Sequence, residues 1–286
     1  MTITDLYTYP VKSLQGIRLT EAEVSDTGLP WDRHWMVVDA RGRFVTQRQL
    51  PAMATLTTAL TDRELVLSQG EERLRLPLRR RPLPSTPVQV WESELSAGDE
   101  GEAASRWLTA RLGLFRGAPL RLVRFGPDQR RAVALDGAEL GTSHTQFADG
   151  FPFLVAAGNS LERLNAALRL AGQDPVPMTR FRANIVIAGV PSPFAELGNA
   201  RLTHRQCQIG LCKPCERCPV VTVDQRSGTR AQPKEPLRTL RQLDLLGDGR
   251  AYFGGNGVLL SGQGGIIRIG DPLCWSPSDS SDRFVR

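Results

Sequence analysis

Twenty prolines and 27 glycines divide this 286-residue chain into short segments, most of which have the character of β-strands. Proline fixes φ and lacks a backbone N–H donor, and glycine favours turns, so long helices are disfavoured over most of the sequence. β-Branched, aromatic and alternating apolar residues predict strands at 3–9, 17–24, 35–39, 44–46, 55–60, 64–67, 73–78, 119–125, 184–188, 201–204, 220–223, 257–260 and 266–269. Strands and helices do not alternate regularly, which argues against a doubly wound α/β fold. We predict an α+β fold that is mostly β, with barrel-like sheets.

Two segments carry a helical pattern. Residues 102–112 repeat apolar side chains at helical spacing. A second helix is expected to begin with Asn159 as its N-cap, with Glu162 three residues later, and to stop at Gly172. Between these two helices the segment 126–146 is polar and irregular, and it is a plausible boundary between two domains.

The domain organisation follows from this boundary. We expect an N-terminal β-rich domain over 1–122 and a second domain over 123–275. The polar tail 276–286 is expected to be disordered. The segment 79–87, which holds three arginines and three prolines, is expected to form a loop.

Composition and charge narrow the function classes. The longest apolar run, 151–158, is far shorter than the roughly 20 residues of a membrane helix, so we expect no membrane association. The N-terminus has no basic start followed by an apolar stretch, so we expect a cytoplasmic protein without a secretory signal. The net charge of +6 favours an anionic ligand or partner. Nucleic acid is not expected as a partner, because the chain has no recognition motif or aromatic-basic stacking surface.

Four of the five cysteines are crowded into twelve positions, as Cys207-x4-Cys212-x2-Cys215-x2-Cys218. One interpretation is a zinc or iron–sulfur site that uses several of these thiolates. A second is that one thiolate is a single ligand to a metal whose other ligands come from a cofactor. A third is that the cysteines are small buried apolar residues without chemistry, which suits Cys207, Cys212 and Cys274 best. The spacing alone leaves these three alternatives open.

Three basic segments are candidate anion sites. "YPVKSLQG" joins a strand to a turn that holds Lys12, a hydroxyl group and a glycine. "WDRHW" places Arg33 between an acid and aromatic residues. "RFRANIVI" is expected to present Arg180, Arg182 and Asn184 on one side of an entering strand, because side chains alternate with a period of two. Only three of the 36 basic residues are lysines, and Lys12 is one of them.

Taken in chain order, "YPVKSLQG", "DRHWMVVDARGRFVTQRQ", "DGFPFLVAAGNSLERLN", "RFRANIVIAG", "KPCERCPVVTVDQRSG", "FGGNGVLL" and "GGIIRIGDPL" resemble one family. They look like the MOSC-domain proteins that carry an N-terminal MOSC β-barrel domain. This branch includes the mitochondrial amidoxime-reducing component and the bacterial YcbX-like proteins. The resemblance extends over nearly the whole chain, and its most specific motifs are "KPCERC" and "YPVKS".

The resemblance implies a β-barrel fold with a molybdenum-pterin (molybdopterin-type) cofactor between the two domains. It also implies a molybdenum-dependent oxidoreductase that reduces N-hydroxylated compounds, by transfer of the N–O oxygen atom to molybdenum. The second cysteine of the family's C-x-x-C pair is the metal ligand and catalytic residue, and this position is Cys218 here. The residues carried over as cofactor-binding are Lys12, Ser13, Arg33, Asp149, Gly150, Phe151, Arg182, Asn184 and Arg217.

The resemblance also sets expectations about partners. The implied substrate is a small N-hydroxylated compound, and a separate ferredoxin- or cytochrome-like protein with its reductase would supply electrons. Gly150 and Phe151 stand where the family often has hydroxyl residues, so only their backbone or Asp149 could contact the cofactor. The family also carries an association with pyridoxal phosphate, for which no residue is assigned. Two alternative functions are a sulfur-transfer module and a non-catalytic zinc or iron–sulfur protein.

Overall fold

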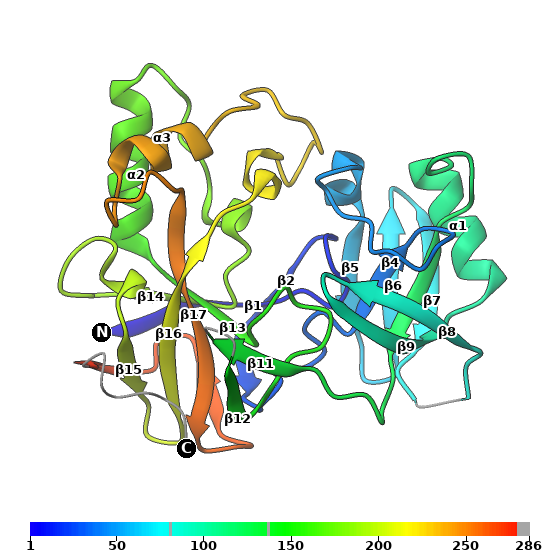
Figure 1. The fold of residues 1–286 in the computed structure, drawn as a ribbon, viewed down its shortest axis with the longest axis horizontal. Helices are drawn as coiled ribbons and strands as arrows, with labels where there is room; N and C mark the ends of the chain where they lie inside the picture. Colours follow the sequence, from blue (N-terminus) through cyan, green and yellow to red (C-terminus); the bar gives the residue numbers. More distant parts are fainter. Residues whose placement is uncertain (80–81, 136–137, 279–286) are drawn as a thin grey trace.

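The computed structural model describes residues 1–79, 82–135 and 138–278. Two lobes lie side by side, and the chain leaves the larger lobe after β3 and returns to it at β11 (Figure 1). The larger lobe contains an eight-stranded sheet, whose strands in spatial order are β19 (Cys274–Pro277), β15 (Ala200–Thr203), β16 (Gln208–Glu216), β17 (Tyr252–Ser261), β13 (Phe153–Ala157), β14 (Ile185–Ala188), β1 (Thr2–Thr8) and β2 (Ile17–Leu19). Its two short strand pairs are β3 (Glu21–Glu23) with β18 (Ile266–Arg268) and β11 (Ala132–Leu135) with β12 (Ala138–His144).

The smaller lobe is made of two antiparallel sheets and one helix. The four-stranded sheet has the order β4 (Trp35–Val38), β10 (Arg121–Phe125), β9 (Ser93–Asp99) and β8 (Ser85–Val90). The three-stranded sheet is β5 (Thr57–Leu60), β6 (Glu64–Gln69) and β7 (Glu72–Pro77), and the helix is α1 (Glu102–Leu112). The remaining helical elements of the described chain are α2 (Gly158–Leu170), α3 (Leu237–Leu243), η1 (Pro51–Thr55), η2 (Met178–Phe181), η3 (Ala195–Leu197) and η4 (Pro219–Thr222).

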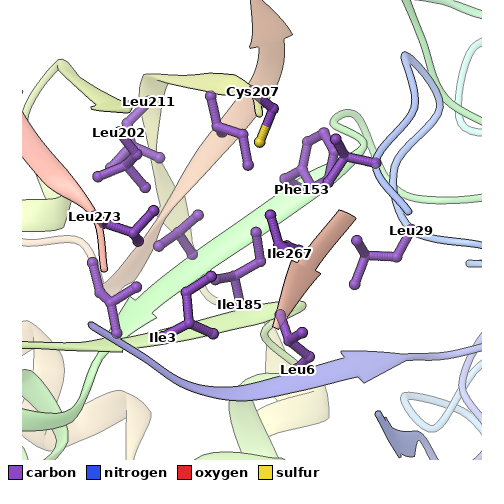
Figure 2. Close-up of a cluster of buried hydrophobic side chains, with 14 of the residues drawn as sticks. Ile3, Leu6, Leu29, Phe153, Ile185, Leu202, Cys207, Leu211, Ile267 and Leu273 are labelled. Carbon is purple, nitrogen blue, oxygen red and sulfur yellow. The ribbon is translucent and has the colours of Figure 1, made fainter. Parts of the chain in front are cut away.

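One crossover organises the large sheet. Strands β13 and β14 pair in parallel, and α2 connects them, while the other pairs in this sheet are antiparallel. Apolar side chains from this sheet and from the β3–β18 pair meet and form a core, as Figure 2 shows for Ile3, Leu6, Phe153, Ile185, Leu202, Cys207, Leu211, Ile267 and Leu273. Complete burial of one such aliphatic side chain stabilises the fold by about 1.5–3 kcal/mol. The prediction of an α+β fold that is mostly β is confirmed.

The predicted N-cap of α2 is wrong. The helix begins at Gly158, and Asn159 Oδ1 is buried without a hydrogen-bond partner among the described residues. The Glu196 carboxylate of η3 lies at this end of the helix instead, where it accepts bonds from Ala157 N at 3.2 Å and Ser160 Oγ at 2.9 Å. Burial raises the pKa of Glu196, and these hydrogen bonds oppose the rise. A capping group from another part of the chain leaves no local signal in the sequence.

Several local predictions also differ from the structure. Residues 220–223 are not a strand, because Pro219 occupies the first turn of the 3-10 helix η4. Strands β8, β9, β13, β16 and β19 and the pair β11–β12 were not expected. Ser276 and Pro277, expected in a disordered tail, pair with β15, and 279–286 lie outside the described residues.

The division into domains 1–122 and 123–275 stays a prediction. Strand pairing groups the chain in another way, because the N-terminal strands β1, β2 and β3 belong to the larger lobe. This grouping matters for function. The turn that follows β1 lies next to segments that are more than 130 residues away in the sequence.

Candidate functional site

A cavity of about 130 Å³ lies where the two lobes meet. Three larger cavities, of about 230, 420 and 550 Å³, contain none of the ten residues predicted for the site. All ten line the smaller cavity: Lys12, Ser13, Arg33, Asp149, Gly150, Phe151, Arg182, Asn184, Arg217 and Cys218. The structure therefore brings together residues from five separate segments of the chain.

Lys12 and Asp149 form a charged pair in the cavity wall. Lys12 Nζ donates to Asp149 Oδ1 at 2.5 Å and to Phe147 O at 2.7 Å. Desolvation lowers the pKa of Lys12, and Asp149 partly opposes this. Desolvation acts to raise the pKa of Asp149, but the Lys12 and Arg48 charges outweigh it and leave that pKa lowered. The pair places an ammonium group and a carboxylate side by side in the wall of the cavity.

Arg33 is held by a network that joins three segments. Its Nη1 donates to Asp32 Oδ2 and, at 3.0 Å, to Asn184 Oδ1, while Nη2 donates to Arg182 O at 3.1 Å. Asn184 Nδ2 in turn donates to Asp32 Oδ1 at 3.0 Å and to Tyr7 O at 3.2 Å. Both amide atoms of Asn184 are thus engaged by the protein. Asn184, which also lines the cavity, is thereby tied to Arg33 and Asp32.

Arg182 differs from Arg33 because part of its guanidinium has no partner. Nη1 donates to Leu14 O at 2.7 Å, but Nη2 is buried without a hydrogen-bond partner among the described residues. Burial lowers the pKa of Arg182 to about 10, so the group stays cationic at neutral pH. The guanidinium lies over the ring of Tyr9 at 4.3 Å. An unpaired buried cation that lines a cavity fits an anionic ligand such as a phosphate.

The backbone around these residues is unusual. Ser13, Arg33 and Arg182 have φ values of 70°, 49° and 55°, in the left-handed region that few residues other than glycine adopt. Such conformations persist where the surrounding structure fixes them, and they cluster at functional sites. Arg182 follows η2, so the predicted entering strand that would align Arg180, Arg182 and Asn184 is wrong. Arg180 points elsewhere and donates to Thr222 O at 3.1 Å.

Cys215 and Cys218 both line the cavity and have different partners. Cys215, at the end of β16, accepts a bond from Arg217 Nη1 at 2.8 Å. Burial raises the pKa of the Cys215 thiol, and the Arg217 charge opposes the rise. Cys218 comes directly before η4, and its Sγ has no hydrogen-bond partner among the described residues. Arg217 Nε is a second buried donor without a partner in this part of the chain.

The other cysteines lie away from the cavity. Cys207 belongs to the core in Figure 2, Cys212 packs with Val133 and Val258, and Cys274 is exposed. Within residues 1–79, 82–135 and 138–278, no group of three or more histidine, cysteine, aspartate or glutamate residues is arranged to hold a metal ion. The structure therefore gives no support to a multi-cysteine site. It leaves Cys218 as the thiol best placed to bind a metal that brings other ligands with it.

The cavity also contains residues that the sequence did not reveal. Thr46, Arg48 and Asn256 line it, and Trp91 lies at its edge, where its indole Nε1 donates to Asp149 Oδ1 at 3.1 Å. Arg48 lies 5.0 Å from the Trp91 ring. Thr46 and Arg48 lie in the segment "VTQRQ" and Asn256 lies in "FGGNG". Nothing in the local sequence distinguished these side chains from surface residues. No helix in the described part of the chain is long and apolar enough to cross a membrane.

Comparisons with known proteins identify the family of this chain. The family model of the MOSC N-terminal beta barrel domain matches residues 1–114, and that of the MOSC domain matches residues 142–274. Mitochondrial amidoxime-reducing component 1 of Homo sapiens is 33% identical over an alignment of 288 positions. The alignment covers 95% of this chain and 82% of that protein. Its Xenopus laevis counterpart is 32% identical over an alignment of 296 positions, which covers 95% of this chain and 81% of that protein.

The relatives in a second group are longer proteins than this chain. Molybdenum cofactor sulfurase of Danio rerio is 30% identical over an alignment of 305 positions. The alignment covers 99% of this chain but 35% of that protein. The similarity to both groups extends over nearly the whole chain. The protein belongs to the MOSC family, in the group that combines the N-terminal β-barrel domain with the MOSC domain.

Proposed function

We propose that this protein is a molybdenum-cofactor-dependent reductase of N-hydroxylated compounds that uses an external electron donor. The observation that carries the proposal is the meeting of the free thiol of Cys218 with the cations Lys12, Arg182 and Arg217 around one cavity. Relatives named for amidoxime reduction support the reaction class. Relatives named for the molybdenum cofactor support the choice of cofactor.

The residues present fit an anionic pterin cofactor that carries a metal. When bound, the molybdenum-pterin group would supply the two-electron chemistry that cleaves the N–O bond. Cys218 would act as the protein's metal ligand, because a thiolate suits such a metal. Arg182 Nη2 and Arg217 Nε, two buried donors without a partner among the described residues, would bind oxygen atoms of the cofactor through charge-assisted hydrogen bonds. Lys12 would add a point charge beside them.

The remaining assignments are also part of the proposal. Electrons would come from a separate ferredoxin- or cytochrome-like protein with its reductase, and the protein would act in the cytoplasm. The Lys12–Asp149 pair and the Arg33 network would keep the wall of the cavity rigid while substrate enters. Pyridoxal phosphate forms no part of the proposal.

Metal and pterin analysis tests this function. The protein is made in a host that synthesises molybdopterin, together with Cys218→Ala and the matched control Cys212→Ala, which removes a thiol of the same segment outside the cavity. We expect molybdenum and pterin in the wild type and the control, and loss of most of the metal from Cys218→Ala. A wild type without molybdenum and pterin, or full retention of molybdenum by Cys218→Ala, would contradict the proposal.

Sulfur transfer is a second candidate function, favoured by two observations. A second thiol, Cys215, lines the same cavity as Cys218, and the sulfurase relative matches nearly the whole chain. Mass spectrometry that finds a persulfide on Cys215 or Cys218, in protein without N-reductive activity, would establish this alternative instead. A zinc or iron–sulfur protein is not proposed, because the described residues contain no cluster of suitable ligands.

A further inference from the structure

Two buried glutamines form a reciprocal pair beside the cavity. Gln47 Nε2 donates to Gln225 Oε1 at 3.1 Å, and Gln225 Nε2 donates to Gln47 Oε1 at 2.9 Å. Both side chains are buried, they are 178 positions apart in sequence, and neither lines the cavity. Because a neutral hydrogen bond contributes little net stability, two buried amides need a reason beyond the strength of their contact.

The pair is connected to both sides of the anion-binding wall. Gln47 Nε2 also donates to Ser13 O at 2.8 Å, in the turn that follows Lys12. Gln225 Oε1 also lies 3.4 Å from Arg182 Nη1. The pair therefore links the Ser13 turn of the N-terminal segment to Arg182 in the second half of the chain.

The pair contacts Ser13 at its backbone carbonyl and Arg182 at its guanidinium, and the backbone of both residues is strained. Ser13 and Arg182 both have positive φ, and this conformation costs on the order of 1–3 kcal/mol unless neighbouring contacts hold it. Arg182 Nη1 is fixed by Leu14 O and Gln225 Oε1, which leaves Nη2 as the free donor of a guanidinium that lines the cavity. Gln225 is therefore one of the two groups that set the orientation of that donor, and Gln47 holds Gln225 in place.

We propose that Gln47 and Gln225 are positioning residues that hold Arg182 and the Ser13 turn ready to bind the phosphate of an anionic ligand. In the choice of ligand, the inference rests on the function proposed above. Neither glutamine touches the cavity, so their effect passes through Arg182 and the Ser13 turn.

Paired substitutions separate positioning from simple structural support. Gln47→Leu or Gln225→Leu alone leaves a buried amide without its partner, so each single variant should unfold at lower urea concentration than the wild type. The double Leu variant removes both amides together, so its urea midpoint should recover part of this loss, while Ser13 O and Val223 O stay without their glutamine donors. A structural role would restore ligand binding together with stability. A positioning role would leave ligand binding impaired.

The test uses full-length protein made in a molybdopterin-competent host. Molybdenum and pterin are measured after purification and during dialysis, beside urea unfolding of the same samples. The control is Ser160→Ala, which deletes a buried hydrogen bond to Glu196 in the larger lobe, away from the cavity. We expect the double variant to lose molybdenum between about tenfold and a hundredfold faster than the wild type, the range for one lost charge-assisted hydrogen bond. Ser160→Ala should lose molybdenum at the wild-type rate.

Two results would overturn the inference. One is a double variant that keeps its molybdenum as long as the wild type does. The other is Ser160→Ala losing molybdenum as fast as the double variant, because that would trace the loss to general destabilisation. If the wild type contains no molybdenum, the proposed function fails, and the pair is tested on metal-free protein with inorganic phosphate. Phosphate should then raise the unfolding temperature of the wild type more than that of the double variant, and equal shifts would refute the inference.

Discussion

The cysteines at the two ends of one short segment have opposite surroundings. Cys207 and Cys212 lie in apolar clusters, where burial raises the pKa of their thiols to about 11 and about 12. Cys215 and Cys218 line a polar cavity next to Arg217. Crowding in the sequence therefore does not mean a shared site. The fold packs the first two thiols into apolar clusters and places the last two at the wall of the cavity.

A second difference separates the two cavity thiols. Cys215 accepts a hydrogen bond from Arg217, while Cys218 Sγ has no such partner in the described structure. A thiol that is already bonded to a guanidinium would have to give up that bond to bind a metal. Cys218 is free to bind without this cost, so the two cysteines of the C-x-x-C pair should behave differently.

Activity should show the largest effect. We expect Cys218→Ala to lower the rate of reduction of an N-hydroxylated amidine, with an artificial electron donor, by roughly 10³-fold or more, the scale for removing one member of a catalytic unit. Cys215→Ala should stay within about tenfold of the wild type, since it removes only a neighbour of Arg217. An equal loss of activity in the two variants would contradict the different roles given to Cys215 and Cys218.

A carboxylate placed at each end of the segment tests the difference in surroundings. Cys212→Asp puts a charge among Val133 and Val258 and should lower the free energy of unfolding by roughly 3 kcal/mol or more. Cys215→Asp should cost within about 1 kcal/mol, because Arg217 lies beside it as a partner. Urea unfolding measures both values. Equal destabilisation by the two variants would show that the cavity end is as apolar as the core.

Thiol reactivity compares the two ends without any substitution. At pH 8, pKa values of about 11 and 12 leave thiolate fractions of roughly 10⁻³ and 10⁻⁴ at Cys207 and Cys212. In metal-free protein, iodoacetamide should modify Cys218, which lines the cavity, faster than either of these buried thiols. Peptide mapping by mass spectrometry gives the rates. Early modification of Cys207 would contradict its burial in the core.

Alkaline pH should reveal the smallest effect. Below pH 9 the Cys207 thiol keeps its proton in both the folded and unfolded states, but between pH 9 and 11 only the unfolded state releases it. Stability should therefore fall as pH rises through this range. The wild type should lose about 1.4 kcal/mol more than Cys207→Ala between pH 7 and pH 10. Cys274→Ala, which removes an exposed thiol, is the control, and a parallel loss in all three proteins would contradict the account.

Local patterns explain which parts of the molecule could be predicted. The apolar repeat at 102–112 gives the bounds of α1, and the motifs around Lys12, Arg182 and Cys218 give residues that meet in one cavity. The spacing of the cysteines left three alternatives open, and the family resemblance selected one. Burial then separated Cys218 from the buried cysteines of the same segment.

Contacts between distant segments could not be predicted in the same way. Glu196 caps α2 from 39 residues away, and the Gln47–Gln225 pair spans 178 positions. Neither contact leaves a periodic or local signal in the sequence, because each one forms only when the fold brings distant segments together. Trp91 at the edge of the cavity belongs to the same class, since its position depends on the pairing of β8 with β9.

X-ray absorption at the molybdenum edge tests most directly the claim that Cys218 alone among the five cysteines binds the metal. It counts the sulfur atoms around molybdenum in the wild type, in Cys215→Ala and in Cys218→Ser, whose hydroxyl keeps a donor atom for the metal. We predict the same sulfur count in the wild type and Cys215→Ala, and one sulfur fewer in Cys218→Ser. An unchanged count in Cys218→Ser, or a lower count in Cys215→Ala, would contradict this account of the site.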